Sequence, residues 1–221
     1  MTQTPQDTDL KTDRSRLRRA HERGAYDRDT LYGVLDAMPL GHIGYQIDGR
    51  PSVLPTLQWR EGDHLYWHGS SASRALRAME GAEVCITVTL LDGYVLARSA
   101  FHHSVNFRSA MVFGRAEKVT DPAAKQARLK AMTEGLFPGR WERLRPITET
   151  EIKATAVLRI PIEEASAKIR SGAPKDDEAD YDLPIWAGVV PMSLQLQSAE
   201  PDPANMQGLK IPDHLRHIQI G

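Results

Sequence analysis

The spacing of apolar residues predicts one clear helix near the start of the chain, over residues 27–38. Asp27 and Asp29 stand at its beginning, where carboxylates accept hydrogen bonds from free N–H groups and suit the helix dipole. Pro39 ends the helix because proline cannot continue it. Residues 1–25 are polar, which predicts a mobile or surface-hugging arm. The predicted apolar face consists of Leu31, Val34, Leu35 and Met38.

Farther along, short apolar or alternating runs separated by turn residues predict a series of β-strands. The predicted strands cover residues 41–46, 51–59, 65–68, 84–90, 94–101, 110–119 and 154–160. Six or seven strands, with helices only at a few crossings, favour a mainly β fold, a closed or nearly closed antiparallel barrel with a few helices. The sheet edges are then removed by closure or buried in a dimer. The predicted helices cover residues 71–80, the segment after Asp121-Pro122, and a short stretch from Pro161 to Arg170.

Turn residues set the expected boundaries between these elements. Asp48-Gly49 predicts a hairpin, and Leu91-Asp92-Gly93 predicts a turn between two strands. Residues 171–183 form an acidic, proline-containing segment, expected to be a loop. We expect one domain over residues 26–195, preceded by the arm of residues 1–25 and followed by a tail of residues 196–221.

Composition narrows the function classes. A chain of 221 residues can bury one substantial core or two small ones. Lys and Arg number 28 against 29 Asp and Glu, so nothing suggests nucleic acid or an anionic membrane as partner. Cys85 is the only cysteine, which excludes an internal disulfide and a cysteine-based zinc site. No apolar run reaches transmembrane length and no signal-peptide core is present, so we expect a cytoplasmic protein.

The segment from Leu65 to Arg74 carries the strongest chemical signal. It has the pattern of a strand end, a turn of small residues and the first turn of a helix. Ser70, Ser71 and Ser73 supply hydroxyl groups, and Arg74 can hold a phosphate through two parallel hydrogen bonds. The segment therefore favours a phosphorylated ligand. The alternative is a plain serine N-cap with a solvent-exposed arginine.

Two further segments have ordinary interpretations when each is considered alone. In residues 106–115 polar residues precede an apolar strand, which suits a simple strand entrance. In residues 186–191 a tryptophan precedes small residues, which suits either a core tryptophan beside a tight turn or close approach to a flat ligand.

Together these segments resemble the FMN-binding split-barrel superfamily of the pyridoxamine 5'-phosphate oxidases. The chain is most similar to the bacterial branch of flavin-nucleotide-binding proteins that includes the nitroimidazole-resistance type. No single motif is diagnostic, and the resemblance rests on order and spacing from about Arg19 to Leu194. The matching segments are Tyr26-Asp27-Arg28, residues 53–56, 67–74, 92–104 and 168–174, and the segment around Trp186.

The resemblance implies FMN as cofactor and a homodimer in which two subunits build each flavin site. It implies that a strand edge hydrogen-bonds the flavin ring, that Trp67 and His68 flank the ring and ribityl chain, and that a serine-arginine group holds the phosphate. Two residues would reach across the dimer interface, and a tryptophan would pack beside the dimethylbenzene ring. The implied residues are Val53, Leu54, Pro55 and Thr56 for the edge, Ser71, Ser73 and Arg74 for the phosphate, Arg108 and Ser109 across the interface, and Trp186.

Two departures from the family pattern bear on the substrate. The oxidases proper carry an arginine shortly after their tryptophan, whereas residues 187–191 contain none. They also carry Arg-Lys where this chain has Arg74-Ala75, which leaves one cation fewer for the flavin phosphate. The first departure argues against pyridoxamine 5'-phosphate as substrate.

The histidines are the candidate proton donors or ligands. His102 and His103 are adjacent on a predicted strand, so they face opposite sides and cannot jointly chelate one ion without a bulge. His68 lies beside the predicted phosphate turn, and its alternative role is to cap a strand-end carbonyl. The acidic residues 175–180 are interpreted as a solvated loop, so no metal site is expected.

The leading functional hypothesis is an FMN-dependent oxidoreductase that takes hydride from NAD(P)H and reduces a small, flat, electron-poor acceptor such as a nitro compound or a quinone. No nucleophile or general base stands out, which suits a reaction that belongs to the cofactor. The alternative is a flavin- or haem-binding module without turnover, used for sensing, storage or haem handling, since some split-barrel relatives bind haem.

Overall fold

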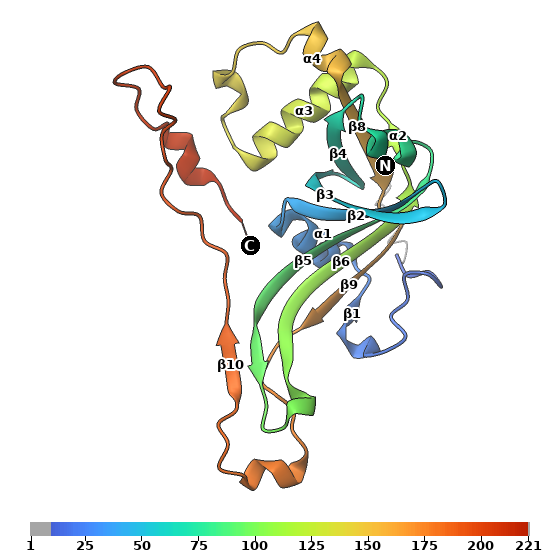
Figure 1. Cartoon of the computed structure of the whole chain (residues 1–221), viewed down its shortest axis with the longest axis vertical. Helices are drawn as coiled ribbons and strands as arrows, with labels where there is room; N and C mark the ends of the chain where they lie inside the picture. Colours follow the sequence, from blue (N-terminus) through green and yellow to red (C-terminus); the bar gives the residue numbers. More distant parts are fainter. Residues whose placement is uncertain (1–9, 221) are drawn as a thin grey trace, which may run out of the picture.

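A ten-stranded antiparallel sheet, curled into a barrel, dominates the computed structural model, which describes residues 10–220 (Figure 1). The strand order is β1-β9-β6-β5-β2-β3-β4-β8-β7, and β10 pairs with β5. This confirms the mainly β fold class expected from the sequence. The strands are β1 (Gly24–Ala25), β2 (Leu40–Ile47), β3 (Arg50–Glu61), β4 (His64–Ser70), β5 (Glu83–Leu96), β6 (Ser104–Arg115), β7 (Glu117–Lys118), β8 (Thr155–Pro161), β9 (Glu164–Arg170) and β10 (Gly188–Pro191).

Few helices accompany the sheet. The helix predicted over residues 27–38 is α1, capped by the Asp27 carboxylate, which accepts from Thr30 N. The helix predicted after Asp121 is α3, with Asp121 as its cap. The α-helices are α1 (Arg28–Ala37), α2 (Arg74–Met79), α3 (Pro122–Leu136) and α4 (Glu149–Ala154), and the 3-10 helices are η1 (His21–Arg23), η2 (Ala100–His102), η3 (Trp141–Arg143), η4 (Glu178–Asp182) and η5 (Asp213–His217).

The main core fills the barrel and is covered by α1. Leu31, Val34 and Leu35 of α1 are buried against it, as the helical spacing predicts. Alternate residues of β5 point into the core, for example Ile86 and Val88, which are fully buried. Each fully buried aliphatic side chain contributes roughly 1.5–3 kcal/mol, so this core supplies most of the driving force for folding.

A smaller second core lies on the outer side of β3, β4 and β8, under α3 and α4. Trp59 and Tyr66 stack with ring centroids 5.6 Å apart. Leu129 of α3, Ile152 of α4 and Val157 of β8 complete it. Strand β4 is therefore covered on both faces, which explains its nearly continuous burial.

Several sequence predictions about the sheet are wrong, and the strand predicted over residues 94–101 ends at Leu96. Residues 91–93 do not turn the chain: β5 runs unbroken from Glu83 to Leu96, with only a register shift between Leu91 and Gly93. Strand β6 pairs with both halves of β5, so long-range pairing keeps the chain extended through a local turn signal. Residues 164–170 are not helical but form β9, because they pair with β6 and β1.

The helix predicted from residue 71 begins later. Ser73 is the N-cap of α2, whose first helical residue is Arg74. Most of the acidic segment is exposed, as predicted, but the side chain of Asp176 is enclosed and forms an ion pair with Arg98 at 2.9 Å. Its carboxylate also accepts from Arg98 N.

The chain ends behave differently from one another. In the N-terminal arm, Leu10 is fully buried in the main core and Ser15 is buried, so the described part of the arm packs on the barrel. Residues 1–9 lie outside the described residues. The tail after β10 is largely exposed and runs back past the sheet to η5 (Figure 1). Within residues 10–220, no helix combines the length and apolar character needed to cross a membrane.

Candidate functional site

The sheet splits where β3 and β4 part, and this split is the candidate site. β3 pairs with β2 along Arg50–Leu57 but with β4 only from Gln58 to Glu61. The stretch 50–57 therefore keeps one free backbone edge. Pro51 and Pro55 lie in this stretch, where a missing N–H is tolerated because the strand pairs on one side only.

The free edge contains all four residues that the family resemblance assigns to the flavin ring. Leu54 packs against the main core, and Val53 lies on the opposite face with about two-thirds of its surface exposed. Pro55 lies on the same face as Val53, and Thr56 on that of Leu54, because successive strand residues alternate. The feature common to these four residues is therefore their free backbone edge. Its unpaired N–H and C=O groups can hydrogen-bond a flat heterocycle.

An ion pair spans the mouth of the split. Arg74 Nη2 donates to Asp48 Oδ2 at 2.6 Å, and both side chains are 76% exposed. Asp48 sits at the tip of the β2–β3 hairpin, where it and Gly49 both have positive φ, as an Asp-Gly hairpin turn requires. Arg74 begins α2, so the pair joins the two sides of the split.

The serines of the turn have separate roles. Ser73 Oγ accepts from Leu76 N at 3.4 Å and caps α2, as the ordinary interpretation of the segment holds. Ser70 Oγ accepts from Ala72 N at 3.2 Å. Ser71 is exposed, and its backbone N–H donates to Ala154 O. Helix α2 spans only six residues, so an anion here would depend on side chains rather than on a helix dipole.

Trp67 and His68 lie on opposite faces of β4. Trp67 is fully buried in the main core, with its Nε1 lacking a hydrogen-bond partner. His68 faces the second core, where its ring meets Trp59 edge-on at 5.9 Å between centroids. Burial lowers the pKa of His68 below the ordinary histidine value. Its Nδ1 is buried without a hydrogen-bond partner.

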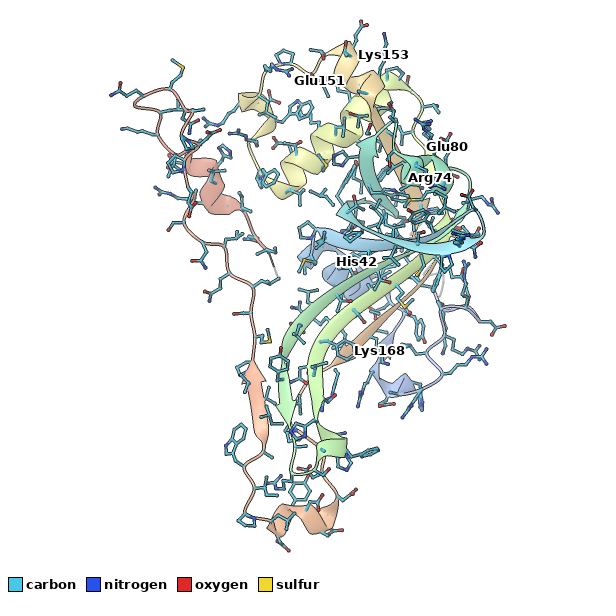
Figure 2. All side chains as sticks on the ribbon, viewed as in Figure 1. His42, Arg74, Glu80, Glu151, Lys153 and Lys168 are labelled. Carbon is cyan, nitrogen blue, oxygen red and sulfur yellow. The ribbon has the colours of Figure 1, made fainter. Side chains whose placement is uncertain are left out.

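Arg108 and Ser109 are distant from this split in the same chain. They are adjacent on β6 and so face opposite sides of the sheet. Arg108 forms a bidentate ion pair with Asp92, with 2.9 Å between Arg108 Nη2 and Asp92 Oδ1. Ser109 is paired with Lys168 of β9, which lies well away from Arg74 in Figure 2.

Trp186 and the histidine pair lie along a second arm, distinct from the N-terminal one, that is formed by β5, β6 and β10. Trp186 is 68% exposed, and its indole ring covers Gly188 at the start of β10. His102 Nε2 is 3.5 Å from Asp177 Oδ2. His103 Nδ1 is 2.9 Å from Ser99 O. These histidines follow the far end of β5, away from α2 (Figure 1).

Sequence reasoning missed three partners at these positions. Asp48 was recognised only as a turn residue, Trp59 only as a strand residue, and Asp92 only as part of a turn. No local pattern marks them, because each contact joins residues brought together by the sheet. Within residues 10–220, no group of three or more His, Cys, Asp or Glu side chains is close enough to hold a metal ion.

Comparison with known proteins agrees with this architecture. The family model described as pyridoxamine 5'-phosphate oxidase matches residues 27–169. The structure of the flavocytochrome Anf3 from Azotobacter vinelandii is 48% identical, with a TM-score of 0.92 over 95% of this chain and 98% of that one. The FAD and haem binding protein from Mycobacterium smegmatis is 36% identical, with a TM-score of 0.85 over 89% of this chain and 97% of that one.

A more distant likeness concerns the fold alone. A 5-nitroimidazole antibiotic resistance protein from Bacteroides thetaiotaomicron is 20% identical, with a TM-score of 0.56 over 66% of this chain and 86% of that one. A comparison with curated proteins gives no significant match.

Proposed function

Because this chain belongs to the pyridoxamine 5'-phosphate oxidase family, we propose that it is a flavin-binding redox protein that also takes up haem. The observation that carries the flavin part is the split between β3 and β4. It combines a free strand edge with an exposed arginine at its mouth. The haem part rests on the two relatives whose descriptions name a flavocytochrome and an FAD and haem binding protein.

The residues around the split fit a flavin. The edge Val53–Thr56 would hydrogen-bond the ring, and Arg74 with the exposed Ser71 would hold the phosphate. Arg74 would exchange its contact with Asp48 for the phosphate, which is feasible because the pair is solvent-exposed and therefore weak. A bound flavin supplies electron and hydride transfer, and the protein supplies binding, orientation and polarity.

The sequence implied FMN, and FAD contains the same FMN portion. The split accounts for that shared portion only. The 36% identical relative is described as binding FAD, which favours FAD as the form held here. The mass of the flavin released from the purified protein distinguishes the two.

We also propose a homodimer with shared flavin sites. Arg108, Ser109 and Trp186 are remote from Arg74 within one chain, so they would contact a flavin only across a subunit interface. Large apolar side chains are exposed on the sheet and the arm, as expected of a surface that a second copy covers. They include Val53, Leu91, Tyr94, Phe101, Met111, Trp186 and Val190.

For the reaction we propose transfer of electrons from NAD(P)H to a flat acceptor such as a nitro compound or a quinone. The oxidases proper carry an arginine in the region where this chain has Val189 and Val190, and valines offer no partner for a buried phosphate. This disfavours a phosphorylated vitamer. A flavin- or haem-binding module without turnover is the second candidate, because the carboxylate at the mouth of the split, Asp48, is already paired with Arg74.

The absorption spectrum of the purified protein tests the proposal. Flavin bands together with a Soret band, and a released flavin identified by mass, are expected. A colourless protein that binds neither FMN nor FAD in titration would overturn it. Turnover of NAD(P)H with a nitro-compound and quinone panel then separates an enzyme from a binding module.

A further inference from the structure

Arg170 is a buried cation at the end of β9, the strand beside which β1 and η1 lie (Figure 1). Only 9% of the residue is exposed. Its Nη1 donates to Asn106 Oδ1 and, at 3.5 Å, to Gly172 O, and both acceptors are neutral. No carboxylate within residues 10–220 forms an ion pair with this guanidinium. A buried charge without a counter-charge costs free energy, so this position calls for an explanation.

Half-buried arginines on other strands present one edge of the guanidinium, formed by Nε and Nη2, to a carboxylate. These pairs are Arg60 with Asp36, Arg108 with Asp92, and Arg159 with Glu117. In Arg170 the same two nitrogens have no acceptor in the described part of the chain. Neither nitrogen is fully enclosed, so a ligand can reach this edge. Two parallel N–H groups in this geometry bind the oxygens of a carboxylate or a phosphate.

A second arginine lies near Arg170 where a counter-charge would be expected. Arg23 of η1 precedes Gly24, which pairs with Lys168 of β9. Burial and the positive charge of Arg23 lower the pKa of Arg170 below the ordinary arginine value. Arg23 is held only loosely, with its Nε 3.6 Å from the exposed Glu22 carboxylate. Lys168 lies on the same face of β9 as Arg170, because strand residues alternate. An anion bound among these cations replaces their mutual repulsion by attraction.

Lys125 of α3 is also a buried cation that faces no carboxylate in the described part of the chain, but it has a structural explanation. Its ammonium group donates to Ile152 O at 3.1 Å and to Thr155 O at 2.8 Å, at the C-terminal end of α4. Carbonyl groups at a helix end are acceptors that lysine side chains commonly satisfy. Arg170 differs because it keeps two accessible N–H groups and has another cation beside it.

We propose that Arg170 and Arg23, with Lys168 beside them, form a binding site for a phosphoryl group. The combined charge of three cations suits a phosphate dianion better than a single carboxylate. The site is separate from the split, because Arg170 pairs with Phe107 of β6 and is remote from α2.

The phosphoryl group has two candidate sources. Lys168 pairs with Ser109, which in the proposed homodimer would contact the partner's flavin. A phosphorylated electron donor such as NADPH is therefore one source, and free inorganic phosphate is the other. The choice of NADPH rests on the proposed function, whereas the site itself rests on Arg170 and its surroundings.

The test is isothermal titration calorimetry of the purified protein with inorganic phosphate, 2',5'-ADP and acetate, in phosphate-free buffer at constant ionic strength. Both phosphorylated probes should bind, and acetate should bind more weakly. Tighter binding of 2',5'-ADP than of phosphate would assign the site to NADPH, and equal affinity would assign it to phosphate itself. Acetate binding as tight as phosphate binding would overturn the phosphoryl assignment.

Arg23→Ala should weaken phosphate binding by about tenfold or more, because it removes a charged hydrogen-bond donor. Arg16→Ala is the matched control, since Arg16 is exposed on the same N-terminal arm and pairs with Asp13. The control should bind phosphate like the unmodified protein. Arg170→Gln keeps a donor for Asn106 but removes the free edge, so it should abolish binding.

Thermal unfolding separates anion binding from a structural role. Without phosphate, Arg23→Ala should be at least as stable as the unmodified protein, because it removes a like charge beside Arg170. Phosphate should raise the Tm of the unmodified protein and leave that of Arg170→Gln unchanged. A structural role would instead make Arg23→Ala less stable in phosphate-free buffer and leave the phosphate effect intact.

The absence of phosphate and 2',5'-ADP binding at millimolar concentration would overturn the site, as would equal binding by Arg23→Ala and the unmodified protein. Flavin content, measured in parallel, should be the same in Arg23→Ala and the Arg16→Ala control. Loss of flavin from Arg23→Ala alone would assign these cations to the flavin and overturn a separate site. Unmodified protein that binds phosphate but no flavin would refute the proposed function and leave this site standing.

Discussion

In the proposed flavin site, Arg74 and Asp48 form the contact that we expect to decide how tightly the split holds an anion. The guanidinium cannot form a bidentate contact with a phosphate while its Nη2 is hydrogen-bonded to the Asp48 carboxylate at 2.6 Å. The proposed flavin site is therefore expected to bind the flavin phosphate by exchange of one exposed ion pair for a stronger, charge-assisted contact.

Arg74→Ala should weaken flavin binding. A hydrogen bond to a charged group is worth roughly 1.5–3 kcal/mol, which corresponds to about ten- to a hundredfold in affinity. The fold should survive, because the side chain is exposed. Titration of the cofactor-free protein with FMN and FAD measures the effect. Unchanged affinity would remove Arg74 from the site, and Arg143→Ala, at an exposed position of η3, is the control.

Asp48→Asn should have the opposite effect. The substitution removes the carboxylate that competes with phosphate and keeps a residue that tolerates positive φ at the hairpin tip. Since an exposed ion pair is worth about 0.2–1 kcal/mol, affinity should rise by roughly two- to fivefold at most. The same titration checks this. Weaker binding in Asp48→Asn would mean that the carboxylate orients Arg74 instead of competing for it.

His68 should make the stability of the cofactor-free protein depend on pH. Burial lowers its pKa in the folded state, so the unfolded chain binds the proton more readily. The stability contributed by the neutral ring is thus present above the unfolded pKa of about 6.5 and is lost as pH falls below it. Thermal unfolding of the protein and of His68→Gln between neutral and mildly acidic pH tests this. A variant with the same pH slope as the unmodified protein would argue against it.

At the scale of elements, β10 depends on close backbone approach. It pairs with β5 along residues 93–96, and at Gly93 the approach is so close that a Cβ there would lie 2.7 Å from Val190 O. Trp186, implied by the resemblance to contact the flavin, precedes this strand. The geometry of the arm therefore depends on one glycine.

Gly93→Ala should detach or shift β10. The cost should be roughly 1–3 kcal/mol, typical of an added methyl group in a packed contact. Denaturant unfolding and tryptophan fluorescence report stability and the environment of Trp186. Gly135→Ala in α3 is the matched control: nothing lies within 4 Å of a Cβ there, so the variant should be neutral or slightly more stable. If Gly93→Ala behaves like the control, β10 is not held by this contact.

At the scale of the whole molecule, the protein should be a homodimer. A single chain leaves many large apolar side chains of the sheet and arm exposed, and it separates Arg108 and Trp186 from the split. Size-exclusion chromatography with light scattering should give about twice the 24.7 kDa chain mass. A monomer that retains flavin would contradict shared sites.

The protein should also lack pyridoxamine 5'-phosphate oxidase activity. Residues 187–191 provide no cation for the vitamer phosphate. The assay is production of pyridoxal 5'-phosphate under air, run beside the nitro-compound and quinone panel with NADH and NADPH. Robust oxidase turnover would mean that another cation, such as Lys168 or Arg170, replaces the absent arginine.

The sequence alone was sufficient for features set by neighbouring residues. The helix capped by Asp27, the hairpin at Asp48-Gly49 and the strands from 41 to 68 follow local periodicity and turn chemistry. The order of motifs was enough to indicate the family, and with it the strand edge and the Arg74 turn. These features depend on interactions within a few residues or on matching a known order.

Only the tertiary structure decided what depends on pairing between distant segments. Residues 164–170 became a strand because β6 and β1 hydrogen-bond them, and residues 91–93 stayed extended because β6 runs alongside. The Arg74–Asp48 pair and the face that His68 presents to Trp59 arise from strand register. Register joins residues far apart in the chain, and one step of it moves a side chain to the other face of a sheet, so local pattern cannot specify these contacts.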